Sequence, residues 1–305
     1  MNKSQLKKKI EKLKKKRNAV ILAHNYQRKE VQDVADYLGD SLGLSIKASQ
    51  TDKDVIVFCG VYFMAETAAI LAPDKTVLIP EENAGCPMAD MIKKEQLEKW
   101  KKENPDNKVV CYVNSTADVK AGCDICCTSS NAVEVVDSLK DEAVMFAPDK
   151  NLASYVAQQS DKNIIPWEGY CYVHHEITPQ EILKLKKAYP NSEVWVHPEC
   201  SPEVTELADK VFSTGKMVEE ARRTDKKDII IGTETGIINR LKKENPEKNF
   251  HPARKQAVCQ DMKKTTLKKV YQALKNMEKK VVVPEEVKDK AKKAIEKMIE
   301  ISSSD

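Results

Sequence analysis

The first elements of the chain are a charged helical segment and a short apolar run. Residues 4–17 place Leu6, Ile10 and Leu13 at helical spacing among lysines and glutamates, a pattern that predicts an amphipathic surface helix. The run Ala19–His24 is apolar up to its last residue and leads into polar residues. Such a run is typical of a buried parallel strand whose carboxyl end opens into a loop.

The same sequence phrases return twice further along the chain. The strand with a polar end recurs, which gives the segments 19–24, 108–116 and 193–199. A second phrase, in which an apolar strand ends in glycine or small polar residues before a helix, occupies residues 55–66, 124–134 and 211–220. A third apolar strand closes each copy, at residues 76–80, 143–147 and 228–232. The repeated order predicts three copies of one α/β unit.

One cysteine follows each copy. Cys86, Cys171 and Cys259 are spaced 85 and 88 residues apart (171 − 86 and 259 − 171), a nearly constant period. Ligands of parallel α/β sheets bind beyond the carboxyl ends of the strands. We therefore expect a pseudo-threefold arrangement that points these strand ends, and the three cysteines, at one common space.

The expected fold class is α/β, with three pseudo-threefold-related three-layer α/β/α domains that contain short parallel sheets. The predicted domains are residues 1–84, 85–170 and 171–262. Residues 263–305 carry helical periodicity around the apolar run 280–284, and we expect them to pack back on the first domain.

Composition narrows the possible functions. The 51 basic and 47 acidic residues leave a net charge of only +4, and the lysines are spread among glutamates, which disfavours a nucleic-acid partner. No apolar run reaches the roughly 18 residues that span a bilayer, and the N-terminal segment lacks the apolar stretch of a secretory signal. We expect a cytoplasmic protein without a membrane partner. Nine cysteines, an odd number, then favour metal or redox chemistry over disulfides.

Two groups of cysteines compete for that chemistry. Cys86, Cys171 and Cys259 would supply three thiolates, enough to hold a cluster of four irons with one iron left open as a Lewis acid. The spacing Cys123-x-x-Cys126 next to Cys127 suits zinc or a redox pair, but no second C-x-x-C or H-x-x-H motif completes a zinc site. We interpret the second group as structural. The same interpretation applies to the remaining cysteines, Cys59, Cys111 and Cys200.

Motifs across nearly the whole chain together resemble one family. They are 23–27 (AHNYQ), 39–42 (GDSL), 61–66 (VYFMAE), 86–89 (CPMA), 112–115 (YVNS), 128–132 (TSSNA), 197–200 (HPEC), 213–215 (STG) and 232–234 (GTE). The chain resembles the quinolinate synthase family of NAD biosynthesis. The resemblance implies three pseudo-equivalent domains around a [4Fe-4S] cluster held by Cys86, Cys171 and Cys259. It also implies a transferase that condenses iminoaspartate with dihydroxyacetone phosphate to quinolinate, releasing phosphate and two waters.

Two departures from the family pattern stand out. Residues 259–262 (CQDM) lack the C-x-x-C-x-x-C pattern that some relatives carry, so no thiol–disulfide switch based on that pattern is expected. Ser130 stands where many relatives have alanine, and the sequence offers no physical reason for a changed activity.

The implied reaction needs groups that bind anions and groups that move protons. Ser41, Ser129, Ser213 and Thr214 stand at or near expected helix starts, where a hydroxyl and main-chain N–H groups suit phosphate or carboxylate, although simple helix capping is the alternative. The expected catalytic residues are His24, Tyr26, Tyr112, His197 and Glu199, and His24, Tyr112, Asn114, His197 and Glu199 are expected to contact substrate.

Each of these assignments has a plainer alternative. The tyrosines could be packed aromatic residues with a satisfied hydroxyl, and Glu199 could be a surface glutamate. His174 is expected to hydrogen-bond a cluster sulfur or the ligand of the open iron, and His175 is expected to be exposed.

Two other functions compete with quinolinate synthesis. A hydro-lyase of the aconitase type also uses an open cluster iron, but one cysteine in each of three repeats disfavours it. A noncatalytic iron–sulfur sensor or zinc-stabilised binding protein would need neither paired histidines at strand ends nor a set of anion-binding turns. Direct handover of iminoaspartate from an aspartate-oxidising enzyme stays open, since nothing in the sequence marks an interface.

Overall fold

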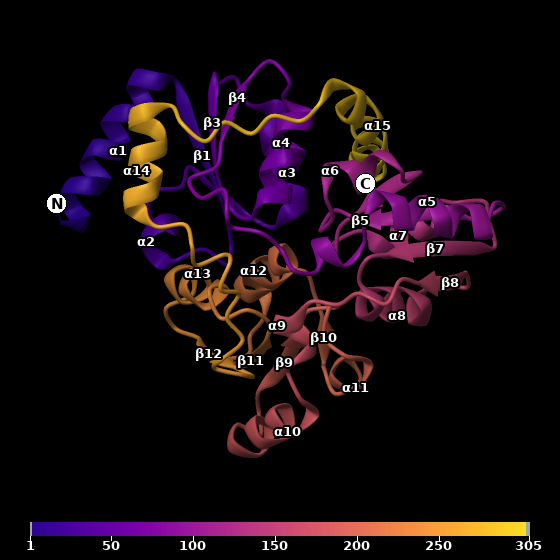
Figure 1. The fold of residues 1–305 in the computed structure, drawn as a ribbon. Helices are drawn as coiled ribbons and strands as arrows, with labels where there is room; N and C mark the ends of the chain where they lie inside the picture. Colours follow the sequence, from indigo (N-terminus) through magenta and orange to yellow (C-terminus); the bar gives the residue numbers. More distant parts are fainter. Residues whose placement is uncertain (1, 303–305) are drawn as a thin grey trace.

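The computed structural model describes residues 2–302, which form three four-stranded sheets surrounded by helices (Figure 1). The first unit contains α1 (Lys3–Arg17), β1 (Ala19–His24), α2 (Lys29–Gln32), β2 (Tyr37–Gly39), α3 (Ser41–Gln50), β3 (Val55–Cys59), α4 (Tyr62–Leu71) and β4 (Thr76–Leu78). The second unit contains a 3₁₀ turn (Ala89–Met91), α5 (Lys94–Glu103), β5 (Lys108–Tyr112), α6 (Ala117–Ala121), β6 (Ile125–Cys127), α7 (Ala132–Asp137), β7 (Ala143–Ala147), α8 (Lys150–Gln159) and β8 (Asn163–Pro166).

The third unit and a C-terminal extension complete the described chain. The third unit contains α9 (Tyr172–His175), α10 (Pro179–Ala188), β9 (Glu193–Val196), α11 (Pro202–Thr205), β10 (Lys210–Val211), α12 (Thr214–Arg223), β11 (Asp228–Gly232), α13 (Ile237–Glu244) and β12 (Asn249–Pro252). The extension contains α14 (Leu267–Asn276) and α15 (Glu285–Ser302).

All three sheets are parallel and share one topology. Their strand orders are β2-β1-β3-β4, β6-β5-β7-β8 and β10-β9-β11-β12. Both faces of the first sheet are buried: Ile21 packs with Leu6 of α1, whereas its neighbour Leu22 packs in the core that contains Leu44 of α3. Successive strand residues point to opposite faces, so an uninterrupted apolar run indicates a sheet covered on both sides. The structure confirms the predicted α/β class with short parallel sheets.

The repeat extends to individual hydrogen bonds. In each unit an aspartate just before or near the edge strand accepts the main-chain N–H of a residue early in the central strand, and its own N–H donates to that residue's carbonyl. The pairs, with the carboxylate distances, are Asp36–Ile21 (2.8 Å), Asp124–Val109 (3.0 Å) and Asp209–Val194 (2.8 Å). Equivalent bonds at equivalent positions show that the three units are copies of one local design.

One part of the predicted strand correspondence is wrong. The sheet orders make β3 equivalent to β7 and β11, and not to β6 and β10, so residues 55–66 do not correspond to 124–134 and 211–220. The missed equivalent is β2, which has three residues and carries Tyr37 with 44% of its surface exposed. By the same shift, β4 corresponds to β8 and β12 rather than to the third strand of the other copies.

The C-terminal extension contacts two units. Leu267, Val270 and Leu274 of α14 pack in the same core as Leu6 and Ile10 of α1. In contrast, α15 packs against α6 and β6 of the second unit as well as against α4 of the first. The expectation that all of 263–305 packs on the first domain is therefore incomplete, and the boundaries at 84/85 and 170/171 stay predictions.

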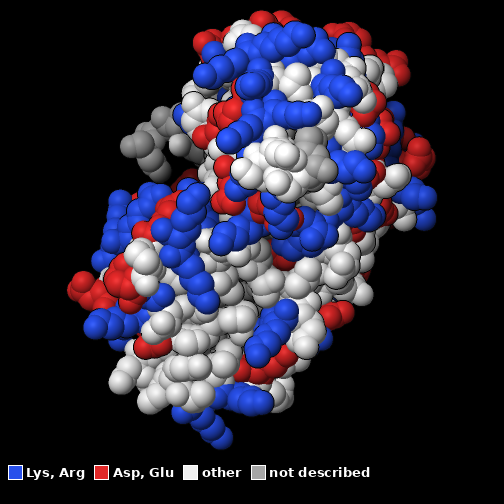
Figure 2. Space-filling model, turned by 90° about the vertical axis from the view of Figure 1, so that its left-hand side faces the viewer, with Lys and Arg blue, Asp and Glu red and all other residues white. Residues whose placement is uncertain are grey.

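Charged groups of opposite sign lie interspersed on the surface. On α1, Lys7 pairs with Asp33 (2.8 Å) and Lys14 pairs with Asp36 (2.7 Å). Figure 2 shows basic and acidic side chains side by side over much of the face that carries the N-terminal helix, and uncharged residues over much of its lower part. Within residues 2–302, no helix has both the length and the apolar character that crossing a bilayer requires.

Candidate active site

A cavity of about 610 Å³, including its open mouth, lies where the three units meet. Its walls come from the segments that follow the carboxyl ends of strands in all three sheets. Twelve of the thirteen predicted site residues line it: His24, Tyr26, Ser41, Cys86, Tyr112, Asn114, Ser129, Cys171, His197, Glu199, Thr214 and Cys259. The pseudo-threefold arrangement thus brings together residues that are up to 235 positions apart (259 − 24).

The thirteenth residue, Ser213, has a capping position. Its Oγ accepts the N–H of Lys216 (3.3 Å) at the start of α12 and lies 3.4 Å from a carboxylate oxygen of Asp40. Among the hydrogen bonds of residues 2–302, none involves the hydroxyl of Ser41 or Ser129. At the start of α3 the capping role belongs to Asp40, which accepts the N–H of Gly43, so the Ser41 hydroxyl is not needed there. These two cavity hydroxyls are therefore free to meet a ligand.

His24 and His197 occupy equivalent places at the ends of β1 and β9. In each ring Nδ1 accepts the main-chain N–H of the residue two positions later, Tyr26 (3.2 Å) or Glu199 (3.3 Å). An accepting Nδ1 leaves the proton of the neutral ring on Nε2, for which no protein acceptor lies in reach among the described residues. Burial lowers the pKa of His24 to about 4 and that of His197 to about 3. Both rings are neutral donors to the cavity at pH 7.

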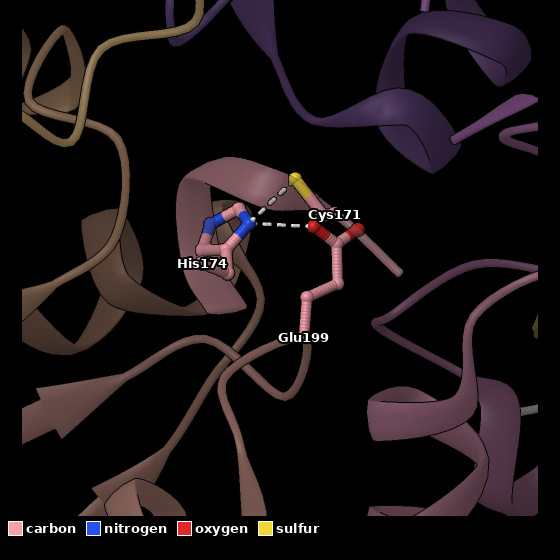
Figure 3. Close-up of side chains that lie close together, drawn as sticks. All are labelled: Cys171, His174 and Glu199. Carbon is pink, nitrogen blue, oxygen red and sulfur yellow. Dashed lines mark hydrogen bonds and ion pairs between the residues drawn. The ribbon is translucent and has the colours of Figure 1, made fainter. Parts of the chain in front are cut away.

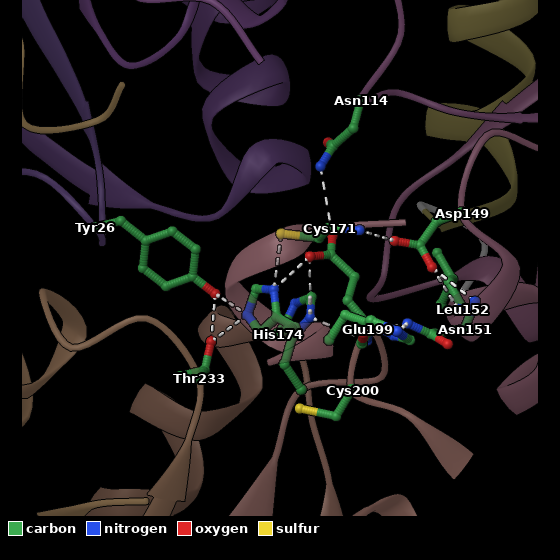
Figure 4. A network of polar contacts seen from close by, with 12 residues as sticks. Tyr26, Asn114, Asp149, Asn151, Leu152, Cys171, His174, Glu199, Cys200 and Thr233 are labelled. Carbon is green, nitrogen blue, oxygen red and sulfur yellow. Dashed lines mark hydrogen bonds and ion pairs between the residues drawn. The ribbon is translucent and has the colours of Figure 1, made fainter. Parts of the chain in front are cut away.

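Glu199 is the centre of a polar network that joins the second and third units (Figure 4). One carboxylate oxygen accepts from the Tyr112 hydroxyl (2.5 Å) and from Asn114 Nδ2 (3.4 Å), and the other lies 2.6 Å from His174 Nδ1. Burial by itself would raise the pKa of Glu199, but the bonds from His174 and Tyr112 hold it below its usual value. With 3% of its surface exposed, Glu199 is a buried carboxylate, so the surface alternative is wrong.

The two tyrosines of the cavity are protonated phenols. Burial and the nearby Glu199 carboxylate raise the pKa of both Tyr26 and Tyr112 well above the ordinary value. The Tyr26 hydroxyl contacts Thr233 Oγ1 (2.5 Å) and His174 Nε2 (3.3 Å), so both hydroxyls are fixed by named partners. Each can donate a hydrogen bond or a proton where it stands.

His174 links Cys171, the residue directly before α9, to this network. Its Nδ1 lies 3.2 Å from Cys171 Sγ and 2.6 Å from the Glu199 carboxylate (Figure 3). Its Nε2 lies 2.8 Å from Thr233 Oγ1 (Figure 4). Cys171, His174 and Glu199 could together hold a metal ion. However, ligands about 2.0–2.3 Å from one ion stay more than about 3 Å apart, whereas His174 and Glu199 are at hydrogen-bond distance. We interpret the group as a hydrogen-bonded support for the Cys171 sulfur.

The three cavity cysteines have the same local surroundings. Burial raises the pKa of each thiol, and in each case the main-chain N–H three residues later, from Ala89, His174 or Met262, acts in the opposite direction on the pKa. Cys86 also raises the pKa of Cys171, and Cys259 raises that of Cys86. All three side chains line the same cavity. Three thiols on equivalent turns, each facing an N–H donor, fit the ligand set of an iron–sulfur cluster with one open iron.

Among the residues that the structure describes, the rival cysteines belong to no group of three side chains that could share a metal ion. Cys126 and Cys127 are successive residues of β6, so their side chains point to opposite faces of the sheet, and both are fully buried. Cys123 donates to the carbonyl of Val119 (3.1 Å). The other structural candidates, Cys59, Cys111 and Cys200, are buried as predicted. Among the described residues, the only cysteines that line the cavity are Cys86, Cys171 and Cys259.

Several residues around the cavity were missed by sequence reasoning. Asp40 accepts from the Ser130 hydroxyl (2.9 Å), which gives the unusual serine a definite partner on another unit. Thr233 connects Tyr26 to His174, and two buried carboxylates, Asp149 and Glu234, accept the main-chain N–H groups of Cys171 and Cys259. His175 is exposed as predicted.

The neutral histidines predict a loss of stability in mild acid. Above pH 6.5 both the folded and the unfolded chain keep these rings neutral, so their contribution is fully present; below it the unfolded chain binds protons that the folded chain excludes until about pH 4 or 3. Each histidine should cost about 2 kcal/mol of unfolding free energy between pH 7 and pH 5. Urea denaturation of the metal-free protein measures the effect. Between pH 7 and pH 5 the unfolding free energy of His24→Gln and of His197→Gln should each fall by about 2 kcal/mol less than that of wild type. An equal fall in variant and wild type would refute the buried neutral state.

Comparison with known proteins gives one consistent result. The family model described as "Quinolinate synthetase A protein" matches residues 8–300. A quinolinate synthase of Dehalococcoides mccartyi (strain CBDB1) is 58% identical over 293 residues, which cover 96% of this chain and 97% of that protein. The quinolinate synthase of Thermodesulfovibrio yellowstonii is 53% identical, over 95% of this chain and 96% of that protein. The quinolinate synthase of Methanosarcina barkeri is 52% identical, over 99% of this chain and 99% of that protein. The chain therefore belongs to the quinolinate synthetase A family.

Proposed function

We propose that this chain is a quinolinate synthase. It condenses iminoaspartate with dihydroxyacetone phosphate to quinolinate, one phosphate and two waters, a step of NAD biosynthesis, and it holds a [4Fe-4S] cluster through Cys86, Cys171 and Cys259. The observation that carries the proposal is the meeting of these three thiols, on equivalent turns, in a cavity lined by neutral histidines and a buried carboxylate. Family membership supports the same activity.

The cysteines fit the cluster in number and in chemistry. Three sulfurs, each with a main-chain donor, can hold the cluster, which when bound supplies an open iron that acts as a Lewis acid toward a substrate hydroxyl or carboxylate. His174 supports the Cys171 sulfur through its Nδ1. Partners of this kind orient ligands and tune the metal.

Substrate anions are assigned to the helix starts. Ser41 begins α3 and Thr214 begins α12, and both side chains line the cavity together with Ser129. Main-chain N–H groups and the positive end of the helix dipole favour phosphate or carboxylate at such positions. The Thr214 hydroxyl is held by a bond from Asn25 Nδ2 (3.0 Å), whereas those of Ser41 and Ser129 lack protein partners among the described residues. The two free hydroxyls are therefore the expected phosphate contacts.

Proton movement is assigned to Glu199 and its neighbours. The Glu199 carboxylate is ionised and can accept a proton during enolisation or loss of water, while the Tyr112 phenol at 2.5 Å can return one. The Nε2–H groups of His24 and His197 are free to hold substrate oxygens. Asn114 Oδ1 is buried and has no hydrogen-bond partner among residues 2–302, which makes it an acceptor suited to the N–H of an imine.

Anaerobic purification with iron and sulfide quantification, followed by a quinolinate assay, tests the proposal. We expect about four irons and four sulfides per chain, and quinolinate formation that requires both substrates. Removal of iron by a chelator should abolish turnover, and reconstitution with iron and sulfide should restore it. Zinc in place of iron, or an iron-loaded protein that forms no quinolinate, would contradict the proposal; the latter result is what a noncatalytic sensor predicts.

The same assay separates the remaining alternatives. A hydro-lyase would dehydrate a hydroxy acid without a second substrate, whereas the synthase needs iminoaspartate. Because iminoaspartate hydrolyses in water, an aspartate-oxidising enzyme is the expected source in the assay and in the cell. The cytoplasmic location stays a prediction, and direct handover from that enzyme stays open.

A further inference from the structure

Two fully buried carboxylates lie beside the proposed cluster ligands without a part in the proposed reaction. Asp149 and Glu234 each have 0% of their surface exposed. Asp149 Oδ2 accepts the main-chain N–H of Cys171 (3.2 Å), and Glu234 Oε1 accepts the main-chain N–H of Cys259 (3.2 Å). Figure 4 shows Asp149 on the far side of Cys171 from His174. Burying a carboxylate costs free energy. The presence of two buried carboxylates, each bonded to the main-chain N–H of a cavity cysteine, therefore calls for an explanation.

The repeat places both carboxylates at one structural position. Each stands two residues after the third strand of its unit, β7 or β11. The residue directly after this position also makes the same hydrogen bond in all three units: its main-chain N–H donates to the carbonyl of the residue two positions before the unit's cavity cysteine. These bonds are Tyr62–Ala84 (2.7 Å), Lys150–Gly169 (2.8 Å) and Thr235–Ala257 (2.9 Å). The turn after the third strand is therefore joined to the cysteine turn in the same way three times.

The first unit lacks the carboxylate. Its equivalent residue, two positions after β3, is Val61, which is 2% exposed and has no side-chain acceptor. Within the described part of the chain, no carboxylate accepts the main-chain N–H of Cys86, although its turn carries the same carbonyl bond. The support is thus present for two of the three cysteines and absent from the third.

Other donors fix both carboxylates in place. Asp149 Oδ1 accepts from the N–H groups of Asn151 (2.8 Å) and Leu152 (2.9 Å) at the start of α8. Glu234 Oε2 accepts from Gly236 N–H (2.7 Å), and its Oε1 also pairs with Lys263 Nζ (2.8 Å). Every carboxylate oxygen has a donor, so the two side chains act as rigid connections between a strand end and a cysteine.

We propose that Asp149 and Glu234 are positioning residues that hold Cys171 and Cys259 for the cluster by their main-chain N–H groups, and that Cys86 is the ligand without this support. The inference rests on the proposed function, since it concerns the same cluster. An N–H held by a fixed carboxylate keeps the peptide plane of the cysteine in one orientation, and with it the direction in which Cβ leaves the backbone. Loss of an outer partner of a metal ligand typically weakens metal binding by about 10–100-fold.

Isosteric variants test this role. Asp149→Asn and Glu234→Gln keep the shape of the side chain but replace one acceptor oxygen with an NH₂ group, so in either orientation a donor faces a donor. We expect each variant to release iron to a chelator about tenfold faster than wild type or more. The controls are Asp124→Asn and Asp209→Asn, which disturb carboxylate bonds to Val109 and Val194 at the opposite end of the sheets. Both controls should release iron at the wild-type rate.

The outcomes separate the two proposals. If the wild-type protein binds no iron after reconstitution, the cluster assignment is wrong and this inference with it. If wild type binds iron but both isosteric variants release it as slowly as the controls, the cluster stands and the positioning role is refuted. Melting of the metal-free variants checks their fold independently of iron, and a changed electron paramagnetic resonance spectrum of the reduced cluster in a folded variant would support a displaced ligand.

Discussion

Cys86→Ser, Cys171→Ser and Cys259→Ser are each expected to lose the cluster and quinolinate formation together, whereas Cys126→Ser should keep both. The three sulfurs line one cavity on equivalent turns, and serine is a far poorer ligand for iron than a thiolate. Cys126 is fully buried within β6 and belongs to no group of cavity ligands. Loss of one of three ligands leaves two irons without protein support, so an effect on activity near the detection limit is expected.

Iron and sulfide content, measured with the quinolinate rate on the same anaerobic preparations, decides this prediction. Cys126→Ser is the matched control because it makes the same substitution at a buried cysteine in strand β6, away from the cavity. Its serine hydroxyl at a dry position should lower stability only, which thermal unfolding records separately. A cluster lost from Cys126→Ser but retained in one of the other three variants would reassign the ligands.

Glu199→Gln should lower kcat by about 10²–10⁴-fold while the cluster stays bound. Glutamine fills the same space, but it cannot take up a proton, and its NH₂ group must face either Tyr112 or His174, both of which now contact a carboxylate oxygen. The change therefore removes the carboxylate that Tyr112, Asn114 and His174 hold in the cavity. Steady-state kinetics on preparations of equal iron content measure the effect.

Glu193→Gln is the control for this substitution. Glu193 begins β9, the strand whose carboxyl end leads to His197 and Glu199, and its carboxylate accepts from Trp195 Nε1 (2.9 Å) away from the cavity. This variant should keep wild-type kcat. If Glu199→Gln instead lost iron in proportion to activity, Glu199 would act through His174 on the Cys171 sulfur rather than in proton transfer.

The architecture could be predicted because it repeats. Buried strands such as Ala19–His24 are uninterrupted apolar runs, and a cysteine recurs at a nearly constant interval, so three α/β units and a shared site follow from pattern and spacing. The edge strand β2 could not be found in this way. It has three residues and an exposed tyrosine, and its pairing with β1 rather than its own apolarity keeps it in the sheet.

That single miss concealed other residues. The wrong pairing of residues 55–66 separates Val61 from its equivalents Asp149 and Glu234. Asp149 therefore gives no signal in the sequence, and Glu234, although it ends the motif 232–234, receives no role from it. The network around Glu199 was hidden for a different reason. Tyr112 and Glu199 are 87 positions apart and meet only because two sheets place their strand ends at one cavity, a contact that no local pattern encodes.

The three cavity sulfurs follow three different sheets along the chain, and this spacing limits when the cluster can be inserted into the newly made protein. During translation the set of thiols is incomplete until Cys259 has left the ribosome and β12 has joined its sheet. Iron delivery must therefore wait for a nearly finished polypeptide. Once inserted, the inorganic centre would cross-link all three units in a protein whose nine cysteines form no disulfide among the described residues.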